Sequence, residues 1–337
     1  MKEMGKQTCR LASPPSVLGA ACTAGKKEGQ GPLGHTLDAI FEDTSMGVSS
    51  WERAESLMQR ETLRLALEKA GIAAKELRYV LAGDLLAQSI GSIFGLRGLD
   101  TPFFGIYGAC STMAEGLGLA AMLMDGGFAR HTAALTSSHF CSAERQFRLP
   151  LEYGGQRPPS AQWTVTGAGA VILGGEGAPY ITHVTTGKIV DAGIKDAANM
   201  GAAMAPAAHD TIRAHFEDTG TSPEDFDLIV TGDLGLLGAD IVRVLFSRED
   251  GLSLGGRYND CGTMIFDCDA DREVQSGGSG CGCSAVVLCG HILGGMRRGM
   301  WNKVLFCGTG ALFSPVSSSQ GESIPAICHA VRLQNAL

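Results

Sequence analysis

The sequence has no uninterrupted apolar stretch of the roughly 18 residues that a membrane-spanning helix requires, so we expect no such helix. It has no excess of positive charge: 27 Lys and Arg against 35 Asp and Glu give a formal net charge of −8, which argues against a nucleic-acid-binding surface. Residues 1–10 lack the apolar core of a secretory leader, and the 11 cysteines are odd in number. Both features predict a reducing compartment. Without a membrane-spanning stretch we expect a soluble chain, which could still dock on a membrane through a partner.

Two similar halves make up the chain. Its 337 residues, 45% of them apolar, suffice for two domains or one large pseudo-symmetric domain. Short apolar runs alternate with helical patterns, which predicts an α/β fold with largely parallel strands covered by helices. The first half has a helix at 51–70, with Ser49 as its N-cap and Gly71 at its end. The pattern then repeats, so we predict an N-terminal half at 1–175 and a C-terminal half at 176–337.

A cysteine stands at the centre of the first half. The apolar run at 103–107 predicts a buried strand, and an Ala/Leu/Met/Gly-rich helix follows it. This order places Cys110 and Ser111 on the first turn of that helix, where unpaired N–H groups and the helix dipole favour a thiolate or a bound anion. The alternative interpretation is a small buried cysteine without chemistry.

The segment at 137–163 is long, and it is rich in arginine and aromatic residues. Long ordered loops in compact domains are usually functional. Arg145 and Arg148 are three residues apart and would share one face of a helix, from which guanidinium groups can bind carboxylates. Alternatively, these arginines pair within the loop with Glu144 and Glu152.

Several motifs resemble a known superfamily. Cys110 at a central strand–helix junction, Gly167–Ala170 and the sequence CGTG at 307–310 resemble the thiolase superfamily, which includes the ketoacyl synthases. This resemblance implies a duplicated fold of two mixed sheets with helices between and outside them, and a homodimer. The stretches at 136–154, 156–170, 258–262 and 28–33 resemble the stage V sporulation protein AD family of spore-forming Firmicutes.

The second resemblance implies a function. It implies a protein that binds dipicolinic acid, with or without calcium, at the inner membrane of the forespore. Such a protein would act with other membrane proteins of the same operon to load calcium dipicolinate into the developing spore.

The groups that handle protons in a condensing enzyme are missing from the two positions where the resemblance would place them. Residues 231–237 contain no histidine, and residues 276–284 contain neither histidine nor asparagine. Losing a general base or an oxyanion donor costs roughly 10²- to 10⁴-fold in rate. We therefore predict a binding pocket that is not an enzyme site. The alternative is an active acyltransferase that uses Cys110, with His139 as its base.

The expected ligand is a planar aromatic dianion, so we predict a site that combines N–H groups, arginines and aromatic rings. Asp233 occupies the family's base position, where it could bind calcium, orient a water or be a plain loop carboxylate. Cys281, Cys283, Cys289 and His291 do not have the usual zinc spacing, so we predict neither a metal site nor a cofactor. The predicted ligand-binding residues are Cys110, Ser111, His139, Phe140, Glu144, Arg145, Phe147, Arg148, Arg157, Trp163 and Asp233.

Overall fold

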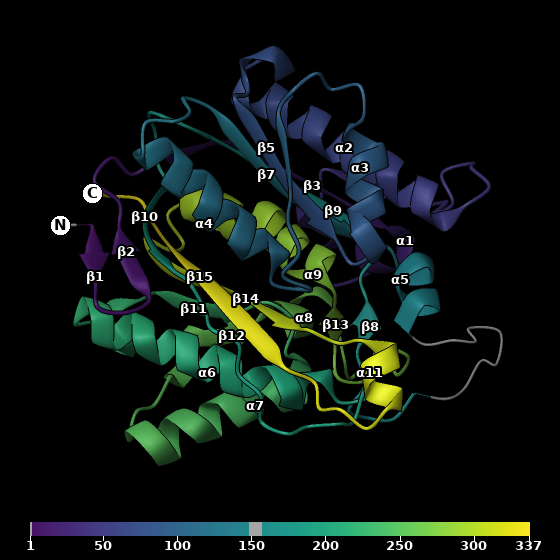
Figure 1. Cartoon of the computed structure of the whole chain (residues 1–337), viewed down its shortest axis with the longest axis vertical. Coiled ribbons are helices and arrows are strands. Elements are labelled where there is room, and N and C mark those ends of the chain that lie inside the picture. Colours follow the sequence, from purple (N-terminus) through teal and green to yellow (C-terminus); the bar gives the residue numbers. More distant parts are fainter. Residues whose placement is uncertain (1, 148–156) are drawn as a thin grey trace.

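The computed structural model of the chain describes residues 2–147 and 157–337. Its strands form two groups of five with the same internal order (Figure 1). The first group contains β3 (Ser16–Gly25), β9 (Gly167–Gly174), β7 (Thr132–Ser138), β5 (Tyr79–Asp84) and β6 (Phe103–Gly105). The second contains β10 (Tyr180–Thr185), β15 (Ala326–Gln334), β14 (Lys303–Ala311), β11 (Leu228–Thr231) and β12 (Tyr258–Asp260).

Strand direction follows the same rule in both groups. The first two pairings of each are antiparallel and the last two are parallel. One residue pair, Tyr180 with Ser16, joins β10 to β3. This pairing connects the two groups into one continuous mixed sheet. The repeated order confirms the duplicated α/β fold.

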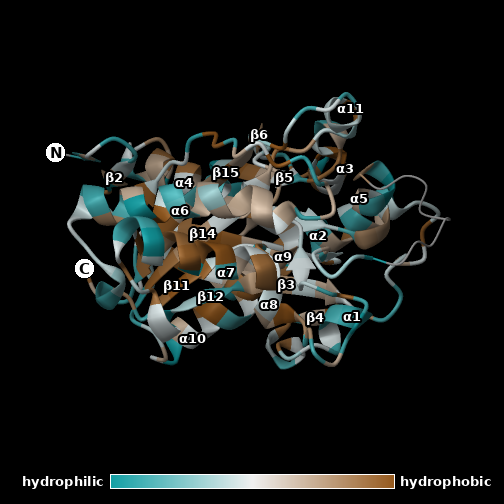
Figure 2. Ribbon diagram, turned by 90° about the horizontal axis from the view of Figure 1, so that it is seen from below, coloured by the Kyte–Doolittle hydropathy of each residue, from teal (hydrophilic) through white to brown (hydrophobic). Residues whose placement is uncertain are grey.

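Helices form layers outside and between the two strand groups (Figure 1). On the outside, α2 (Trp51–Ala70) and α3 (Ile90–Leu96) cover the first group, and α6 (Met200–Thr219) and α7 (Gly235–Leu245) cover the second. Between the groups lie α4 (Thr112–Asp125) and α9 (Cys281–Val286), which continues through a π-helical stretch (Val287–Ile292) into α10 (Leu293–Arg297). Hydrophobic residues accordingly concentrate on the inner strands and helix faces (Figure 2).

The remaining elements are short. β1 (Glu3–Met4) and β2 (Thr8–Arg10) extend the sheet beside β10, and β4 (Ala39–Phe41) pairs with β3. β8 (Trp163–Thr164) and β13 (Gly278–Ser279) form a separate two-stranded sheet. The other short helices are α1 (Lys26–Gly29), α5 (Phe140–Phe147), α8 (Cys261–Ile265) and α11 (Pro315–Ser319). Within the described residues, no helix is long and apolar enough to cross a membrane.

The structure corrects three local predictions. Ser50, and not Ser49, caps α2, because its side chain accepts a hydrogen bond from the Arg53 N–H. The segment at 103–107 is not a buried strand: β6 is the last strand at its end of the sheet, and its three residues are exposed. Cys110 does not lie on the first turn of the helix, because α4 begins at Thr112 and Cys110 lies in the preceding turn.

Candidate functional site

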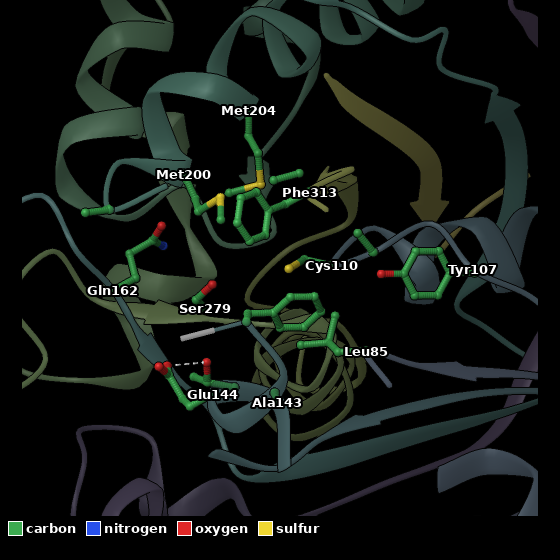
Figure 3. Close-up of a pocket in the computed structure, with 15 residues that line it drawn as sticks. Leu85, Tyr107, Cys110, Ala143, Glu144, Gln162, Met200, Met204, Ser279 and Phe313 are labelled. Atoms are coloured by element: carbon green, nitrogen blue, oxygen red, sulfur yellow. Dashed lines mark hydrogen bonds between the residues drawn. The ribbon is translucent and has the colours of Figure 1, made fainter. Parts of the chain in front are cut away.

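A cavity opens beside Cys110, where segments from both halves of the chain meet (Figure 3). It encloses about 670 Å³ of empty space, including its open mouth. Most of its wall is apolar, and its few polar side chains come from the turn after β6, from α5, from β8 and the residue before it, and from β13. The lining residues are Leu85, Tyr107, Ala109, Cys110, Ala143, Glu144, Phe147, Gln162, Thr164, Ala198, Met200, Met204, Ser279, Ala311 and Phe313.

The turn that carries Cys110 is held by its neighbours' side chains. Ala109 has a φ of 50°, a left-handed conformation that is rare for a residue with a Cβ. The Ser111 hydroxyl donates to the Gly108 carbonyl at 2.7 Å, and the Thr112 hydroxyl donates to the Ala109 carbonyl at 2.6 Å. Ser111 is itself fully buried, so its role here is to hold the turn.

The second half of the chain packs directly against this turn. A Cβ at Gly310 would lie 2.3 Å from the Gly108 carbonyl oxygen, and one at Gly308 would lie 2.8 Å from the Ala114 Cβ. Only glycine allows the β14 backbone to approach so closely. The CGTG sequence at 307–310 therefore brings the two halves together at the cysteine.

The Cys110 thiol is in contact with a carboxyl group. The Asp233 carboxyl and the Gly280 N–H are the polar groups that act on its ionisation. Desolvation, followed by the negative charge of Asp233, raises the pKa of Cys110 well above its ordinary value, and the Gly280 N–H opposes this only in part. The thiol is therefore protonated near neutral pH, in contrast to the thiolate that the sequence suggested.

Asp233 is fully buried. Its carboxyl oxygens accept hydrogen bonds from the Gly280 N–H at 2.8 Å, the Thr309 hydroxyl at 2.8 Å and the Ser279 hydroxyl at 3.2 Å. Burial raises the pKa of Asp233 to about 7, although these donors favour its ionised form. Asp233 is thus a buried neighbour of Cys110, so it is more than the plain loop carboxylate that was one of its three expected roles.

Glu144 lines the cavity, and Arg157 lies against it. The two side chains form an ion pair at 3.1 Å, and the Thr164 hydroxyl donates to the same Glu144 oxygen at 2.8 Å. The guanidinium also lies 4.9 Å from the ring centre of Trp163 and 5.2 Å from that of Phe140, which stack on each other at 4.1 Å. Phe140, Arg157 and Trp163 therefore pack beside the cavity without lining it.

The other predicted residues lie farther away. Arg145 forms an ion pair with Glu52 on α2 and does not line the cavity. The His139 ring contacts the Thr44 carbonyl at 3.0 Å and lies 5.4 Å from the Trp51 ring, also outside the cavity. Arg148 lies outside the described residues. Of the eleven predicted residues, Cys110, Glu144 and Phe147 are the ones that line the cavity.

The described lining of the cavity contains no histidine. All eight histidines fall within the described part of the chain, and none is a lining residue. Two of the buried cysteines have backbone partners: the Cys281 thiol donates to the Ser137 carbonyl at 2.9 Å, and the Cys289 thiol donates to the Ala170 carbonyl at 3.6 Å. Among residues 2–147 and 157–337, no cluster of three or more potential metal-ligating side chains occurs.

Sequence reasoning missed most of the apolar wall. Met200 and Met204 lie on α6, and Phe313 follows β14, so all three come from the second half of the chain (Figure 3). The available signal was the start of α6, where Met200 and Met204 are separated by three small residues. Methionine is equally common in ordinary cores, so this signal does not predict a site.

The duplicated five-stranded groups and the cysteine turn define a protein with the thiolase-like fold. 3-Oxoacyl-[acyl-carrier-protein] synthase III from Aquifex aeolicus has this fold, with a TM-score of 0.56 and 13% identity over 95% of this chain and 99% of that one. Human mitochondrial 3-ketoacyl-CoA thiolase, solved with CoA, matches with a TM-score of 0.59 and 12% identity over 97% and 99%. At these identities the similarity concerns the fold alone.

The chain belongs to the stage V sporulation protein AD family, which matches residues 5–334. It is 45% identical over 337 residues to the stage V sporulation protein AD of Bacillus subtilis (strain 168), a match that covers 100% of this chain and 99% of that protein. The chain is therefore a member of a sporulation family on a thiolase-like fold.

Proposed function

We propose that this protein binds dipicolinic acid in the cavity beside Cys110, without catalysis, and serves its uptake into the developing spore. The observation that carries the proposal is the cavity itself: it retains an apolar wall around a protonated thiol, and no imidazole lines it. Such a cavity can hold a ligand, and its described lining lacks the imidazole base on which acyl transfer at a cysteine commonly depends.

The wall suits a flat aromatic ligand. Tyr107, Phe147 and Phe313 contribute rings from three separate segments, and Met200 and Met204 add flexible apolar surface. Rings pack favourably against such surfaces. The polar side chains of Gln162 and Ser279 lie on the same wall, within a largely apolar surround.

The charge of the wall favours a neutral form of the ligand. Among the described lining residues the charged side chain is Glu144, and its carboxylate is paired with Arg157, which lies beside the cavity, at 3.1 Å. This pair is close to neutral and the rest of the described wall is largely apolar, so the wall offers a free dianion no net positive charge, whereas calcium dipicolinate carries no net charge. Calcium also prefers carboxylate oxygens as ligands. We infer that the cargo enters as the calcium chelate, with its metal facing Glu144.

Calorimetric titration tests this proposal. Calcium dipicolinate should bind the natural chain at pH 7. Ala311→Trp, which fills the cavity, should abolish the heat of binding. Glu144→Gln keeps the shape but removes the charge, so it should weaken binding of the chelate by about tenfold, the effect of one charge-assisted contact. Glu224→Gln, on an exposed residue elsewhere, is the matched control. Unchanged binding in Ala311→Trp would refute the site.

Incubation with acetyl-CoA tests the absence of catalysis. Because the Cys110 thiol is protonated and no histidine lines the cavity, we expect no acyl adduct on Cys110 by intact-protein mass spectrometry. A stable adduct that Cys110→Ala removes would instead establish the acyltransferase alternative.

We also propose a homodimer that pairs through β6 and acts at the spore inner membrane with other membrane proteins of its operon. β6 ends one side of the sheet, and Phe103 and Phe104 are 39% and 45% exposed there. Exposed apolar edge strands tend to pair with another chain. Phe104→Asp should convert the dimer to a monomer in sedimentation velocity, and a monomeric natural chain would contradict the proposal.

A further inference from the structure

A second cavity lies beside β2, β10 and β15. In Figure 1, β2 and β10 lie on the left of the molecule, and α5 and β8 of the first cavity lie on the right. It encloses about 1370 Å³ of empty space, including its open mouth. Lys2, Arg10, His183 and Arg332 line it together with polar and apolar residues, and no aspartate or glutamate side chain does so. Its wall therefore differs in character from that of the cavity beside Cys110.

Three of these side chains form one row across the sheet. His183 on β10 is paired in register with Arg10 on β2, and on its other side with Arg332 on β15. Residues directly opposite each other on antiparallel strands share a face, and neighbouring strands lie roughly 4.8 Å apart. The two arginines therefore flank one histidine on the same face of the sheet.

The two arginines are not directly opposite each other, but their like charges repel across the single strand that separates them unless an anion compensates them. Lys2 has a partner, Asp125, at 2.7 Å. Within the described residues, neither Arg10 nor Arg332 forms an ion pair, and the Arg332 Nε–H donates to the Gln334 side chain at 3.0 Å. The Asp225 carboxylate influences the pKa of Arg332, but it already accepts hydrogen bonds from the Ser222 N–H at 2.8 Å and from the Ser222 hydroxyl at 3.1 Å.

Burial and the positive charge in this row lower the pKa of His183. Burial, and after it the charges of Arg332, Arg10 and Lys303, lower the pKa of His183 to about 4. The imidazole is therefore neutral at pH 7, and it contributes ring nitrogens to the wall without adding a third charge. Burial also lowers the pKa of Arg332, and Arg10 adds to this effect.

We propose that Arg10 and Arg332 together bind a small oxyanion, a phosphate or carboxylate group, in this cavity. Two guanidinium groups on one face match the geometry of such an oxyanion, because each can donate two parallel hydrogen bonds. The bound anion supplies the negative charge that the surrounding side chains do not. This site is separate from the cavity beside Cys110 and does not depend on the function proposed for it.

Titration with inorganic phosphate at pH 7 and low salt tests the site in the full chain. We expect one saturable site that Arg10→Gln and Arg332→Gln each weaken about tenfold or more, the effect of losing a charge-assisted hydrogen bond. Arg53→Gln, on an exposed arginine of α2, should bind as the natural chain does. Ala311→Trp should also leave phosphate binding unchanged, which separates this result from a failure of the proposed function.

Thermal unfolding gives a second readout that does not require tight binding. Without phosphate, Arg10→Gln should melt at a higher temperature than the natural chain, because it relieves the repulsion across β10. Phosphate should raise the melting temperature of the natural chain and not that of the variant. Absence of saturable binding up to about 10 mM phosphate, or equal binding by the arginine variants, would overturn the proposal.

Vesicles containing phosphatidylglycerol distinguish the two sources of the oxyanion. Co-sedimentation that Arg10→Gln abolishes and inorganic phosphate competes away assigns the site to a lipid headgroup. Phosphate binding without co-sedimentation assigns it to a soluble oxyanion.

Discussion

Replacement of Asp233 by asparagine probes the surroundings of Cys110 most sensitively. The Asp233 carboxyl is fully buried, and burial raises its pKa from 3.8 to about 7. In the unfolded chain this group loses its proton near pH 4, whereas in the folded chain it keeps the proton up to about pH 7. The folded state therefore loses stability as the pH rises between these two values.

The magnitude follows from the displacement of the pKa. One pKa unit corresponds to about 1.4 kcal/mol, so ionisation of Asp233 lowers the free energy of unfolding by up to about 4 kcal/mol between pH 4 and pH 7. Asparagine has nearly the same shape and cannot ionise. Its carbonyl can accept from the Gly280 N–H, and its amide can donate to the Thr309 hydroxyl.

The assay is urea unfolding of the natural chain and of Asp233→Asn at several pH values from 4 to 8. Between pH 4 and pH 7, the free energy of unfolding of the variant should rise by up to about 4 kcal/mol relative to that of the natural chain. Asp240→Asn, on an exposed residue of α7, controls for the loss of any one carboxylate. A difference between the natural chain and Asp233→Asn that does not change with pH would refute the account of this site.

Three further predictions concern the cysteine turn and the helix boundary. Cys110 should react with iodoacetamide at pH 8 at least about tenfold more slowly than free cysteine, because its pKa is raised; rapid alkylation in mass spectrometry would contradict this. Gly310→Ala should lower the unfolding free energy by about 1–3 kcal/mol, because its Cβ would meet a carbonyl at 2.3 Å. Gly256→Ala, which has open space, should change it little, and equal effects in urea unfolding would count against the close approach. Ser50→Ala should cost about 1 kcal/mol in the same assay and Ser49→Ala almost nothing, whereas the reverse order would restore Ser49 as the cap.

The sequence predicted the architecture well because periodicity and helix caps are local signals. Helix α2 occupies the predicted residues 51–70, and Gly71 ends it in the left-handed conformation that favours glycine. Burial is not a local signal, and this explains the error at 103–107. The aromatic run has the composition of an inner strand, but its position at the end of the sheet is set by strand order.

The site was harder to predict because its wall is assembled from both halves of the chain. Cys110, Glu144 and Phe147 were predicted and line the cavity, whereas Met204 and Phe313 reach it from distant elements. The partners of the arginines could not be predicted from the sequence either. The sequence indicated groups that could hold a carboxylate, and the fold gives Arg145 and Arg157 carboxylates of the protein itself as partners.

Crystals soaked with calcium dipicolinate give the most direct test of the central claim, that the cavity beside Cys110 is a binding site without acyl chemistry. The account predicts electron density for the ligand between Phe313 and Glu144, with its calcium on the Glu144 side and Cys110 unmodified. Ligand density found only at another location, or a covalent adduct on the Cys110 sulfur, would contradict it.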